Sequence, residues 1–307
     1  MKSLLSIVIP VYRSSNTIIE LASRVDLTLK KINQPYEMIF VDDGSQNKKT
    51  DSALEYIQQT YSAKIIILSR NFGQHAATLC GLQQSKGEYV ITMDDDLQHA
   101  PEDIPKLLQA PLHDITIAKF PNVKQSLKRR FFSKIKSYFD FIIINKPLKL
   151  ELTSFRLFNR FTVNNMDRIQ TSYPFIPAQM LFITRDISNI ELQHHVREVG
   201  QSNYNFFKLF KLFSNLLINN SVFMLVALAR IGLTASLVSI FFALYVIYQH
   251  FFNSSIIAGW TSTIVVISFL GGLNLFGLGI IGEYLLRIVK STERTPCFII
   301  RDIIENE

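Results

Sequence analysis

The feature that most restricts how this chain can fold is an uncharged segment near its C-terminal end. Residues 231–282 form a run of 52 positions without a lysine, arginine, aspartate or glutamate. Because a helix needs about 20 apolar residues to cross a bilayer, the run predicts two spanning helices, at about 231–252 and 259–282, joined by the polar turn 253–255. A buried helical hairpin in a water-soluble core is the alternative, but uncharged runs of this length are rare there.

Basic residues flank this segment on both sides, whereas its central turn has none. Positive charge beside a membrane span marks the cytoplasmic side. We therefore expect both flanks of the predicted hairpin to be cytoplasmic and the turn to lie outside. The flanking residues are Lys208, Lys211 and Arg230 before the hairpin, and Arg287, Lys290, Arg294 and Arg301 after it.

Composition narrows the remaining classes of protein. The 307 residues are 48% apolar and 19% charged, which is too apolar for a disordered chain. The two cysteines exclude a disulfide-stapled scaffold and a multi-cysteine zinc module. A net charge of +7 indicates a polyanionic partner. Since the basic runs border membrane-active segments rather than a groove-reading motif, we expect a membrane surface or phosphorylated substrates, and no nucleic acid.

The first 110 residues alternate between strand patterns and helix patterns, with short loops between them. This alternation predicts an α/β fold with a mainly parallel sheet covered by helices on both faces. The predicted strands are residues 4–9, 36–41, 64–68 and 88–93, and the predicted helices are about 16–32, 48–60, a segment that ends near 85, and 101–108.

A polar cluster follows each predicted strand, at residues 10–12, 42–45, 69–71 and 94–98. Ligands of parallel α/β sheets bind beyond the carboxyl ends of the strands, so the four clusters are expected to meet at one rim. The chain has no Gly-x-Gly-x-x-Gly and no Walker Gly-x-x-x-x-Gly-Lys motif. A glycine-rich loop is therefore not the predicted phosphate ligand.

The acidic run Asp94-Asp95-Asp96 offers another way to hold phosphates. A divalent cation, Mg²⁺ or Mn²⁺, takes oxygen ligands and can bridge carboxylates and a diphosphate. On an extended strand Asp94 and Asp96 share one face with Gln98, and Asp95 points away. The alternative is an acidic surface turn that caps the next helix.

Several motifs resemble a known family. Residues 6–12 (SIVIPVY), 41–45 (VDDGS) and 93–98 (MDDDLQ) resemble the family 2 glycosyltransferases, which have a GT-A fold. Further segments are similar to the polyprenyl-phosphate glycosyltransferases, the dolichyl-phosphate mannose synthase-like group that includes bacterial undecaprenyl-phosphate sugar transferases. These segments are residues 69–75 (SRNFGQH), 155–157 (FRL), 197–204 (REVGQSNY) and 279–284 (GIIGEY). The resemblance covers nearly the whole chain.

The resemblance implies an inverting transfer of a sugar from a nucleotide diphosphate, with UDP favoured, to undecaprenyl or another polyprenyl phosphate. A phosphate monoester has a second pKa of about 6 and is therefore already a nucleophile at neutral pH. This chemistry needs no strong general base, and the sequence has no convincing Ser-His-Asp triad. It needs a group that stabilises the leaving diphosphate, for which the resemblance implies Mg²⁺ or Mn²⁺.

The resemblance also implies roles for individual residues. Asp94, Asp96 and Arg197 are the expected catalytic residues, Arg197 by reaching the donor diphosphate. The expected ligands of the nucleotide sugar are Pro10, Tyr12, Asp42, Arg70, Asp94 and Asp95. Asp96 and Gln98, with Asp94, are the expected metal ligands. Arg129 and Ser133, one helical turn apart, and Lys119 are the expected ligands of the acceptor phosphate.

The expected organisation follows the membrane. Residues 1–200 would form a cytoplasmic GT-A domain with an interfacial helix at about 127–144, because cations and bulky apolar groups are mixed there. A second amphipathic helix would cover 201–222, a two-helix membrane hairpin 223–286, and a cytoplasmic tail 287–307. The resemblance places such a protein in the bacterial inner membrane as a multi-pass protein with both termini cytoplasmic, and implies a homo-oligomer such as a tetramer.

Two departures from the family pattern leave alternatives open. Relatives often have an acidic residue before the Phe-Arg-Leu motif, where this chain has Ser154, and a lysine where it has Asn203. A catalytically weakened homologue that acts as a membrane scaffold is therefore one alternative. A processive polysaccharide synthase is another, but it normally carries a Gln-x-x-Arg-Trp motif, and the chain's one tryptophan, Trp260, lies in a predicted span.

Overall fold

The computed structural model describes most of the N-terminal two thirds of the chain and one long helix near the C-terminus. The described residues are 3–61, 63–111, 113–120, 146–147, 149–169, 171, 173–192, 230–231, 234, 241, 259–292 and 296–305. The chain divides into two compact units: residues 1–203 with 294–307, and residues 204–293.

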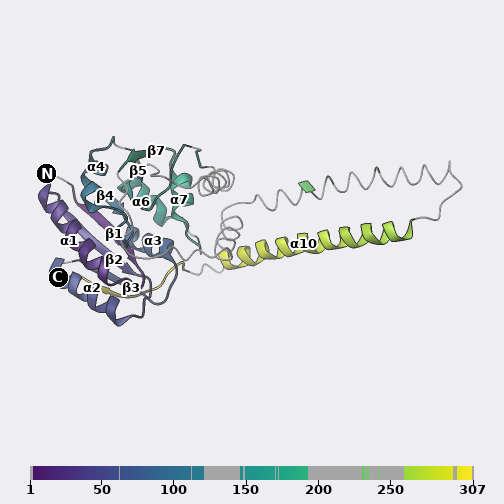
Figure 1. Cartoon of the computed structure of the whole chain (residues 1–307), viewed down its shortest axis with the longest axis horizontal. Coiled ribbons are helices and arrows are strands. Elements are labelled where there is room, and N and C mark those ends of the chain that lie inside the picture. Colours follow the sequence, from purple (N-terminus) through teal and green to yellow (C-terminus); the bar gives the residue numbers. More distant parts are fainter. Residues whose placement is uncertain are drawn as a thin grey trace. The chain divides into compact units, whose positions relative to one another are not determined.

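An eight-stranded sheet is the centre of the first unit (Figure 1). Its order is β7-β5-β6-β4-β1-β2-β3-β8, in which β6 and β8 are antiparallel to the other strands. The strands are β1 Leu5–Val11, β2 Tyr36–Asp42, β3 Lys64–Leu68, β4 Tyr89–Thr92, β5 Ile115–Lys119, β6 Arg156–Asn159, β7 Ile187–Glu191 and β8 Ile300–Ile304. The four strands expected in the first 110 residues are confirmed.

Helices cover both faces of this sheet (Figure 1). The helices of the first unit are α1 Asn16–Lys31, α2 Lys48–Tyr61, α3 Gln74–Gln84, the short 3₁₀ helix η1 Pro101–Asp103, α4 Ile104–Gln109, α6 Arg160–Asp167 and α7 Ile176–Ile183. Crossovers between parallel strands are right-handed. As the chain runs outward from β1 to β3 and then returns past β1 to β4, α1 and α2 cover one face and α3 the other. The expected α/β fold is confirmed.

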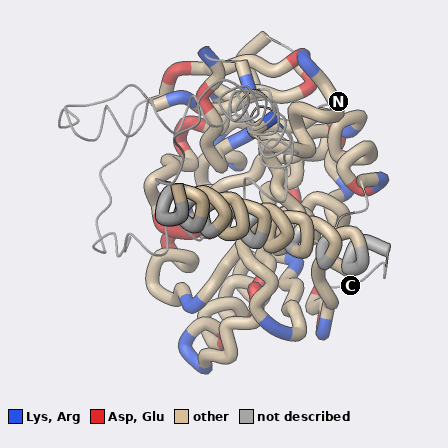
Figure 2. The backbone as a smooth tube through the Cα atoms, turned by 90° about the vertical axis from the view of Figure 1, so that its right-hand side faces the viewer, with Lys and Arg blue, Asp and Glu red and all other residues tan. Residues whose placement is uncertain are grey.

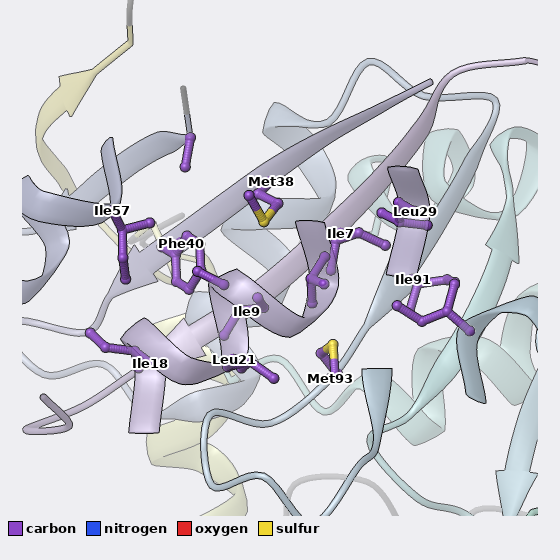
Figure 3. Close-up of a cluster of buried hydrophobic side chains, with 14 of the residues drawn as sticks. Ile7, Ile9, Ile18, Leu21, Leu29, Met38, Phe40, Ile57, Ile91 and Met93 are labelled. Carbon is purple, nitrogen blue, oxygen red and sulfur yellow. The ribbon is translucent and has the colours of Figure 1, made fainter. Parts of the chain in front are cut away.

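The alternation of side chains along β1 explains how one strand serves both cores. Successive strand residues point to opposite faces. Ile7 and Ile9 pack into the core under α1 and α2, which also contains Phe40 and Leu21 (Figure 3). Val8 packs into the other core, beneath α3. The approach of α3 is so close that a Cβ at Gly81 would lie 2.3 Å from Val8 Cγ1, so only glycine fits there.

The C-terminal residues form a strand that the sequence analysis did not anticipate. β8 pairs antiparallel with β3 at the edge of the sheet, and the Ser69 N–H donates to Ile299 O across 2.9 Å. Glu305 forms ion pairs with Lys64 at 3.1 Å and Lys86 at 3.2 Å. The predicted tail 287–307 therefore contributes to the same sheet as the N-terminal strands.

The described part of the second unit consists mainly of α10, Trp260–Thr292. The positions of α10 whose side chains are described carry no charged residue and are tan in Figure 2, and the charged positions of this helix, Glu283, Arg287 and Lys290, are not among them. Within the described residues, no helix combines the length and the apolar character that crossing a bilayer requires.

Candidate functional site

The polar clusters meet at one edge of the sheet, as the sequence analysis expected. β1, β2, β3 and β4 are parallel neighbours in the order β4-β1-β2-β3. Their carboxyl ends therefore lie side by side, and each continues into one of the four clusters. The strand order reverses between β1 and β4, which is where open α/β sheets bind ligands.

Asp42 and Ser45 connect the loops after β1 and β2. The Ser45 N–H lies 3.2 Å from both carboxylate oxygens of Asp42, and the Ser45 hydroxyl donates to Oδ1. The Arg13 N–H donates to Ser45 Oγ across 2.8 Å. Burial raises the pKa of Asp42, while the bonds from Ser45 lower it in part. Asp42 is therefore a buried acceptor in a loop that its own hydrogen bonds shape.

Pro10 lies near the carboxyl end of β1, and Tyr12 is the first residue after this strand. Pro10 is buried in the strand, whereas Tyr12 is 44% exposed. The Arg13 guanidinium lies 5.2 Å from the centre of the Tyr12 ring. An exposed aromatic ring at the strand's carboxyl end is available to stack on a planar ligand group.

Asp43 and Gly44 hold the loop after β3. Asp43 accepts from the N–H groups of Phe72 at 2.7 Å and Gly73 at 2.8 Å. Burial raises the pKa of Asp43, and these two bonds lower it in part. Gly44 has a φ of +63°, and a Cβ there would lie 2.4 Å from the carbonyl carbon of Arg70. Only glycine combines this φ with so close an approach.

Arg70 is an exposed residue of this loop. Its guanidinium carbon lies 4.4 Å from the centre of the Phe72 ring, which is within the range of a cation–π contact. The backbone of Arg70 is fixed by Gly44, while its charge remains at the rim.

Asp94 is bonded through its backbone and both carboxylate oxygens. Gln74 Nε2 donates to Oδ1 across 2.6 Å, and the Ser154 hydroxyl donates to Oδ2. The Asp94 N–H donates to His99 Nδ1 at 3.2 Å. The His99 ring is stacked between Phe120 and Phe155, with ring centres 5.6 and 5.3 Å away. His99 is therefore a backbone cap for the loop that contains Asp94.

Asp95 faces a different set of groups from Asp94. The Ser14 hydroxyl and the Tyr12 N–H are hydrogen-bonded to it. Burial, followed by repulsion from Asp94, raises the pKa of Asp95 to about 6. β4 ends at Thr92, so these aspartates lie in a loop rather than on an extended strand. Asp94 and Asp95 contact different groups, but the face alternation expected for an extended strand does not apply in this loop.

Asp96 and Gln98 form a local pair. Gln98 Nε2 donates to Asp96 Oδ2 across 2.7 Å, and the Gln98 N–H donates to Oδ1 at 3.2 Å. Across the part of the chain that the structure describes, no three His, Cys, Asp or Glu side chains converge as metal ligands. One carboxylate with one amide oxygen nevertheless fits Mg²⁺ or Mn²⁺, because such ions usually take one or two carboxylates and complete their shell with phosphate oxygens and water.

Arg156 and His75 lie beneath this rim. Arg156 on β6 is only 5% exposed, and its Nε donates to the carbonyl of Thr153. Burial lowers the pKa of Arg156 to about 10, although Asp94 opposes this shift. Burial, followed by the charge of Arg156, lowers the pKa of His75 to about 4. The His75 ring meets Phe175 edge-on at 4.9 Å, so His75 is a neutral lining residue at physiological pH.

The residues expected at the acceptor phosphate are less fully described. Lys119, at the end of β5, forms ion pairs with Glu191 at 3.4 Å and Glu151 at 3.6 Å. A phosphate at this position would compete with both carboxylates. Arg129, Ser133 and Arg197 lie outside the described residues.

The family model for glycosyl transferase family 2 matches residues 6–188. This range contains all of the rim described above and more than half of the chain. The chain belongs to glycosyl transferase family 2. It is therefore a glycosyltransferase, and its aspartate-lined rim is the expected donor side of a GT-A enzyme.

Relatives match this transferase over almost its entire length. The undecaprenyl-phosphate 4-deoxy-4-formamido-L-arabinose transferase of Pectobacterium atrosepticum is 31% identical over 97% of this chain and 93% of its own. The protein of the same name from Pseudomonas savastanoi pv. phaseolicola is 30% identical over 98% and 91%. Both the family and the polyprenyl-phosphate group that the motifs indicate are thus confirmed.

A solved structure supports the fold of the transferase. Glucosyl-3-phosphoglycerate synthase from Mycobacterium tuberculosis, crystallised with Mn²⁺, UDP and phosphoglyceric acid, superimposes with a TM-score of 0.53 at 14% identity. The alignment covers 71% of this chain and 77% of that one. At this identity, the likeness establishes the GT-A fold and leaves the ligands to be argued from the site itself.

Four residues of the transferase site were missed as site residues. In the sequence analysis, Asp43 and Gln74 are named only as members of motifs, and Ser154 only as a departure from the family pattern. Arg156 belongs to the Phe-Arg-Leu motif but had no role assigned. One feature of the sequence indicates a role for Arg156. It is a charged residue between two apolar ones, Phe155 and Leu157, both of which lie in the core.

Proposed function

We propose that this transferase moves a sugar from a nucleotide diphosphate to undecaprenyl phosphate or a related polyprenyl phosphate, with inversion at the anomeric carbon and without a base catalyst. The observation that carries the proposal is the aspartate rim at the β1/β4 switch point, combined with relatives that are named for undecaprenyl-phosphate sugar transfer. UDP is the proposed nucleotide, as in the resemblance.

The donor would occupy the rim from β1 to β4. Pro10 and Tyr12 line the proposed nucleoside side, where the exposed Tyr12 ring can stack on a base. Asp42 keeps acceptor capacity for the base, because Oδ2 receives only the long bond from the Ser45 N–H. Arg70 contributes an exposed positive charge. Asp94 and Asp95 would lie beside the ribose and diphosphate.

Asp96 and Gln98 would hold the divalent cation. Gln98 donates its amide N–H to Asp96, so the amide oxygen of Gln98 and the carboxylate of Asp96 stand side by side as the proposed ligands. When bound, Mg²⁺ or Mn²⁺ supplies charge that stabilises the leaving diphosphate. The backbone N–H of Gln98 also donates to Asp96 Oδ1, so Asp96 and Gln98 are oriented by hydrogen bonds within the protein.

The acceptor needs orientation rather than activation. A phosphate monoester is largely dianionic at neutral pH, so its oxygen can attack the anomeric carbon directly while the sugar–diphosphate bond breaks. The barrier comes from bringing two anions together. We assign this task to Arg129, Ser133, Lys119 and Arg197, with Lys119 released from Glu151 and Glu191 when phosphate binds.

The sheet supports the proposed membrane topology. β8 follows the uncharged segment 231–282 in sequence, yet it pairs with β3 in the first unit. A chain that enters a bilayer after β7 and rejoins the same sheet at β8 must cross an even number of times. A two-helix hairpin at 223–286 meets this requirement, with the catalytic domain and both termini on the cytoplasmic side of a bacterial inner membrane.

One experiment tests donor and acceptor together. Membranes that contain the full chain are incubated with undecaprenyl phosphate and a panel of UDP- and GDP-linked sugars, and the lipid product is analysed by mass spectrometry. We expect one glycosyl-phosphoundecaprenol product that is absent from membranes with Asp96→Ala. If no sugar in the panel reaches the lipid, or if Asp96→Ala membranes make the same product, the proposal is wrong.

A further inference from the structure

Ser154 lies where the family pattern has an acidic residue, and its hydroxyl is bonded to the aspartate rim. It donates to Asp94 Oδ2, while Gln74 donates to Oδ1 across 2.6 Å. Ser154 stands between β6 and the preceding loop, sixty residues after Asp94 in sequence, and Gln74 begins α3. Two neutral donors from separate segments are thus hydrogen-bonded to the two carboxylate oxygens of Asp94.

The backbone around Ser154 is itself fixed. Its carbonyl accepts from Thr92 Oγ1 across 2.7 Å, which ties the loop to the end of β4 just before Asp94. The neighbouring Thr153 hydroxyl donates to Ala118 O at 2.7 Å, on β5. Since β4, β6 and β5 are hydrogen-bonded neighbours, the Ser154 hydroxyl is presented to Asp94 from a rigid part of the sheet.

Fixing both oxygens determines which lone pairs of Asp94 remain open. An ionised carboxylate has about four acceptor sites, and Gln74 and Ser154 occupy one on each oxygen. The Asp94 N–H is also bonded, to His99 Nδ1. The carboxylate plane therefore has a single orientation, and its open acceptor sites are set before any ligand arrives. Pre-orientation of this kind reduces the entropy lost on binding.

The charge of the residue at position 154 matters as well. Asp94 already neighbours Asp95 and Asp96, and the buried Arg156 is the nearby cation. A serine stabilises the Asp94 carboxylate through a hydrogen bond and adds no negative charge. A carboxylate at the same position would face Asp94 at hydrogen-bonding distance, and like charges so close repel.

We propose that Ser154 is a positioning residue of the donor site, which, together with Gln74, orients the Asp94 carboxylate toward the ribose and diphosphate of the nucleotide sugar. The inference rests on the proposed function, because it takes the ligand to be a nucleoside diphosphate. On this proposal, a serine at position 154 contributes to donor binding and does not indicate weakened activity.

The test compares two hydroxyl deletions in adjacent residues. Ser154→Ala removes the bond to Asp94, whereas Thr153→Val removes the bond to Ala118 and leaves Asp94 untouched. Ser154→Thr retains the hydroxyl. Each variant of the full chain is purified in detergent, its thermal unfolding is recorded, and its affinities for UDP and GDP with Mn²⁺ are measured by calorimetry.

We expect Ser154→Ala to weaken binding of the nucleotide that the wild type prefers by about fivefold to tenfold, the size of one hydrogen bond to a charged group. Thr153→Val and Ser154→Thr should stay within about twofold of the wild type. In steady-state transfer, Ser154→Ala should raise the KM for the donor and leave the KM for the lipid phosphate unchanged.

Three results would overturn the inference. Ser154→Ala could bind nucleotide as tightly as the wild type, Thr153→Val could lose as much affinity as Ser154→Ala, or Ser154→Thr could fail to restore it. A wild-type protein that binds neither UDP nor GDP would instead overturn the proposed function, and the inference with it. Wild-type binding with an unaffected Ser154→Ala variant separates the two failures.

Discussion

The side-chain amide of Gln74 donates to Asp94 Oδ1 across 2.6 Å, so the first residue of α3 is linked directly to the loop after β4. The exposed Gln74 side chain reaches over the rim to make this bond. The helix that returns from β3 to β4 therefore begins beside the proposed donor site. A polar residue at the start of that helix therefore influences the aspartate that follows the next strand.

Replacing Gln74 tests whether this link depends on a donor. Gln74→Ala removes the bond, and Gln74→Glu replaces the donating amide with a carboxylate that repels Asp94. We expect nucleotide affinity to fall in the order wild type, Gln74→Ala, Gln74→Glu, with the last variant about tenfold or more weaker than the wild type. Calorimetric titration with UDP and Mn²⁺ measures this order. A Gln74→Glu variant that binds as well as Gln74→Ala would contradict the role of charge.

How far the sequence predicts this fold depends on whether a contact is local. The β1–β4 strands and their helices follow from hydrophobic patterns within each segment, and the rim clusters follow from the parallel order of the strands. β8 was missed because its pairing with β3 joins residues more than 230 positions apart, and five exposed or half-buried residues carry little periodic signal.

The contacts of Asp94 show the same limit at the site. Asp94 was recognised from the acidic run, but its partners Gln74 and Ser154 are 20 and 60 residues away. Their approach depends on the antiparallel insertion of β6 beside β4, which no local pattern indicates. The sequence thus predicts which residue types line the rim. It does not predict which of them are hydrogen-bonded to each other, because that depends on how the strands pair.

Gly44 and Gly73 form a matched pair for testing the loop packing. Both have positive φ, but a Cβ at Gly44 would collide with the backbone of Arg70 at 2.4 Å, while a Cβ at Gly73 meets nothing within 4 Å. We expect Gly73→Ala to cost about 1–2 kcal/mol through φ strain alone. Gly44→Ala should cost more and should also weaken nucleotide binding, because it displaces the Arg70 loop. Thermal unfolding and UDP titration of both variants measure the difference. Equal effects would exclude the collision as the cause.

Half-buried His75 should make stability depend on pH. Its pKa is lowered from 6.5 to about 4 in the folded protein by burial and by Arg156. Between these values the unfolded chain binds a proton that the folded protein does not, so stability is lost as the pH falls from 6.5 toward 4. Because solvent screens the partly exposed ring, we expect the free energy of unfolding to fall by only about 1–2 kcal/mol over this pH range.

The His75→Gln variant isolates this contribution. Glutamine does not titrate, so the unfolding midpoint should vary less between pH 6.5 and pH 4 than it does in the wild type. His113, which pairs with Asp186 at 2.5 Å on the surface, supplies the control substitution His113→Gln. A wild-type pH profile that His75→Gln leaves unchanged would assign the titration to other groups.

Glu305 should stabilise the sheet through a buried cation. It pairs with Lys64, whose side chain is 8% exposed, and with Lys86, whose side chain is 65% exposed. Glu305→Gln leaves the buried ammonium of Lys64 without its carboxylate, whereas Lys86→Ala removes only a surface charge. We expect the first substitution to cost about 1–2 kcal/mol and the second less than about 0.5 kcal/mol. Chemical denaturation of the two variants gives both values, and equal losses would show that the Lys64 pair adds nothing beyond a surface interaction.

Asp96 should be the residue on which transfer depends most. Its carboxylate is oriented by the N–H and amide groups of Gln98, and it contributes the charge in the proposed metal-binding pair. Asp96→Ala should abolish sugar transfer and weaken Mn²⁺-dependent UDP binding by more than about tenfold. Its unfolding midpoint should stay close to that of the wild type, since Asp96 is only half-buried. Asp51→Ala, at an exposed position on α2, serves as the matched control and should retain full activity. Full transfer by Asp96→Ala would remove the metal assignment, whereas a lowered unfolding midpoint would mean that Asp96 supports the loop rather than the reaction.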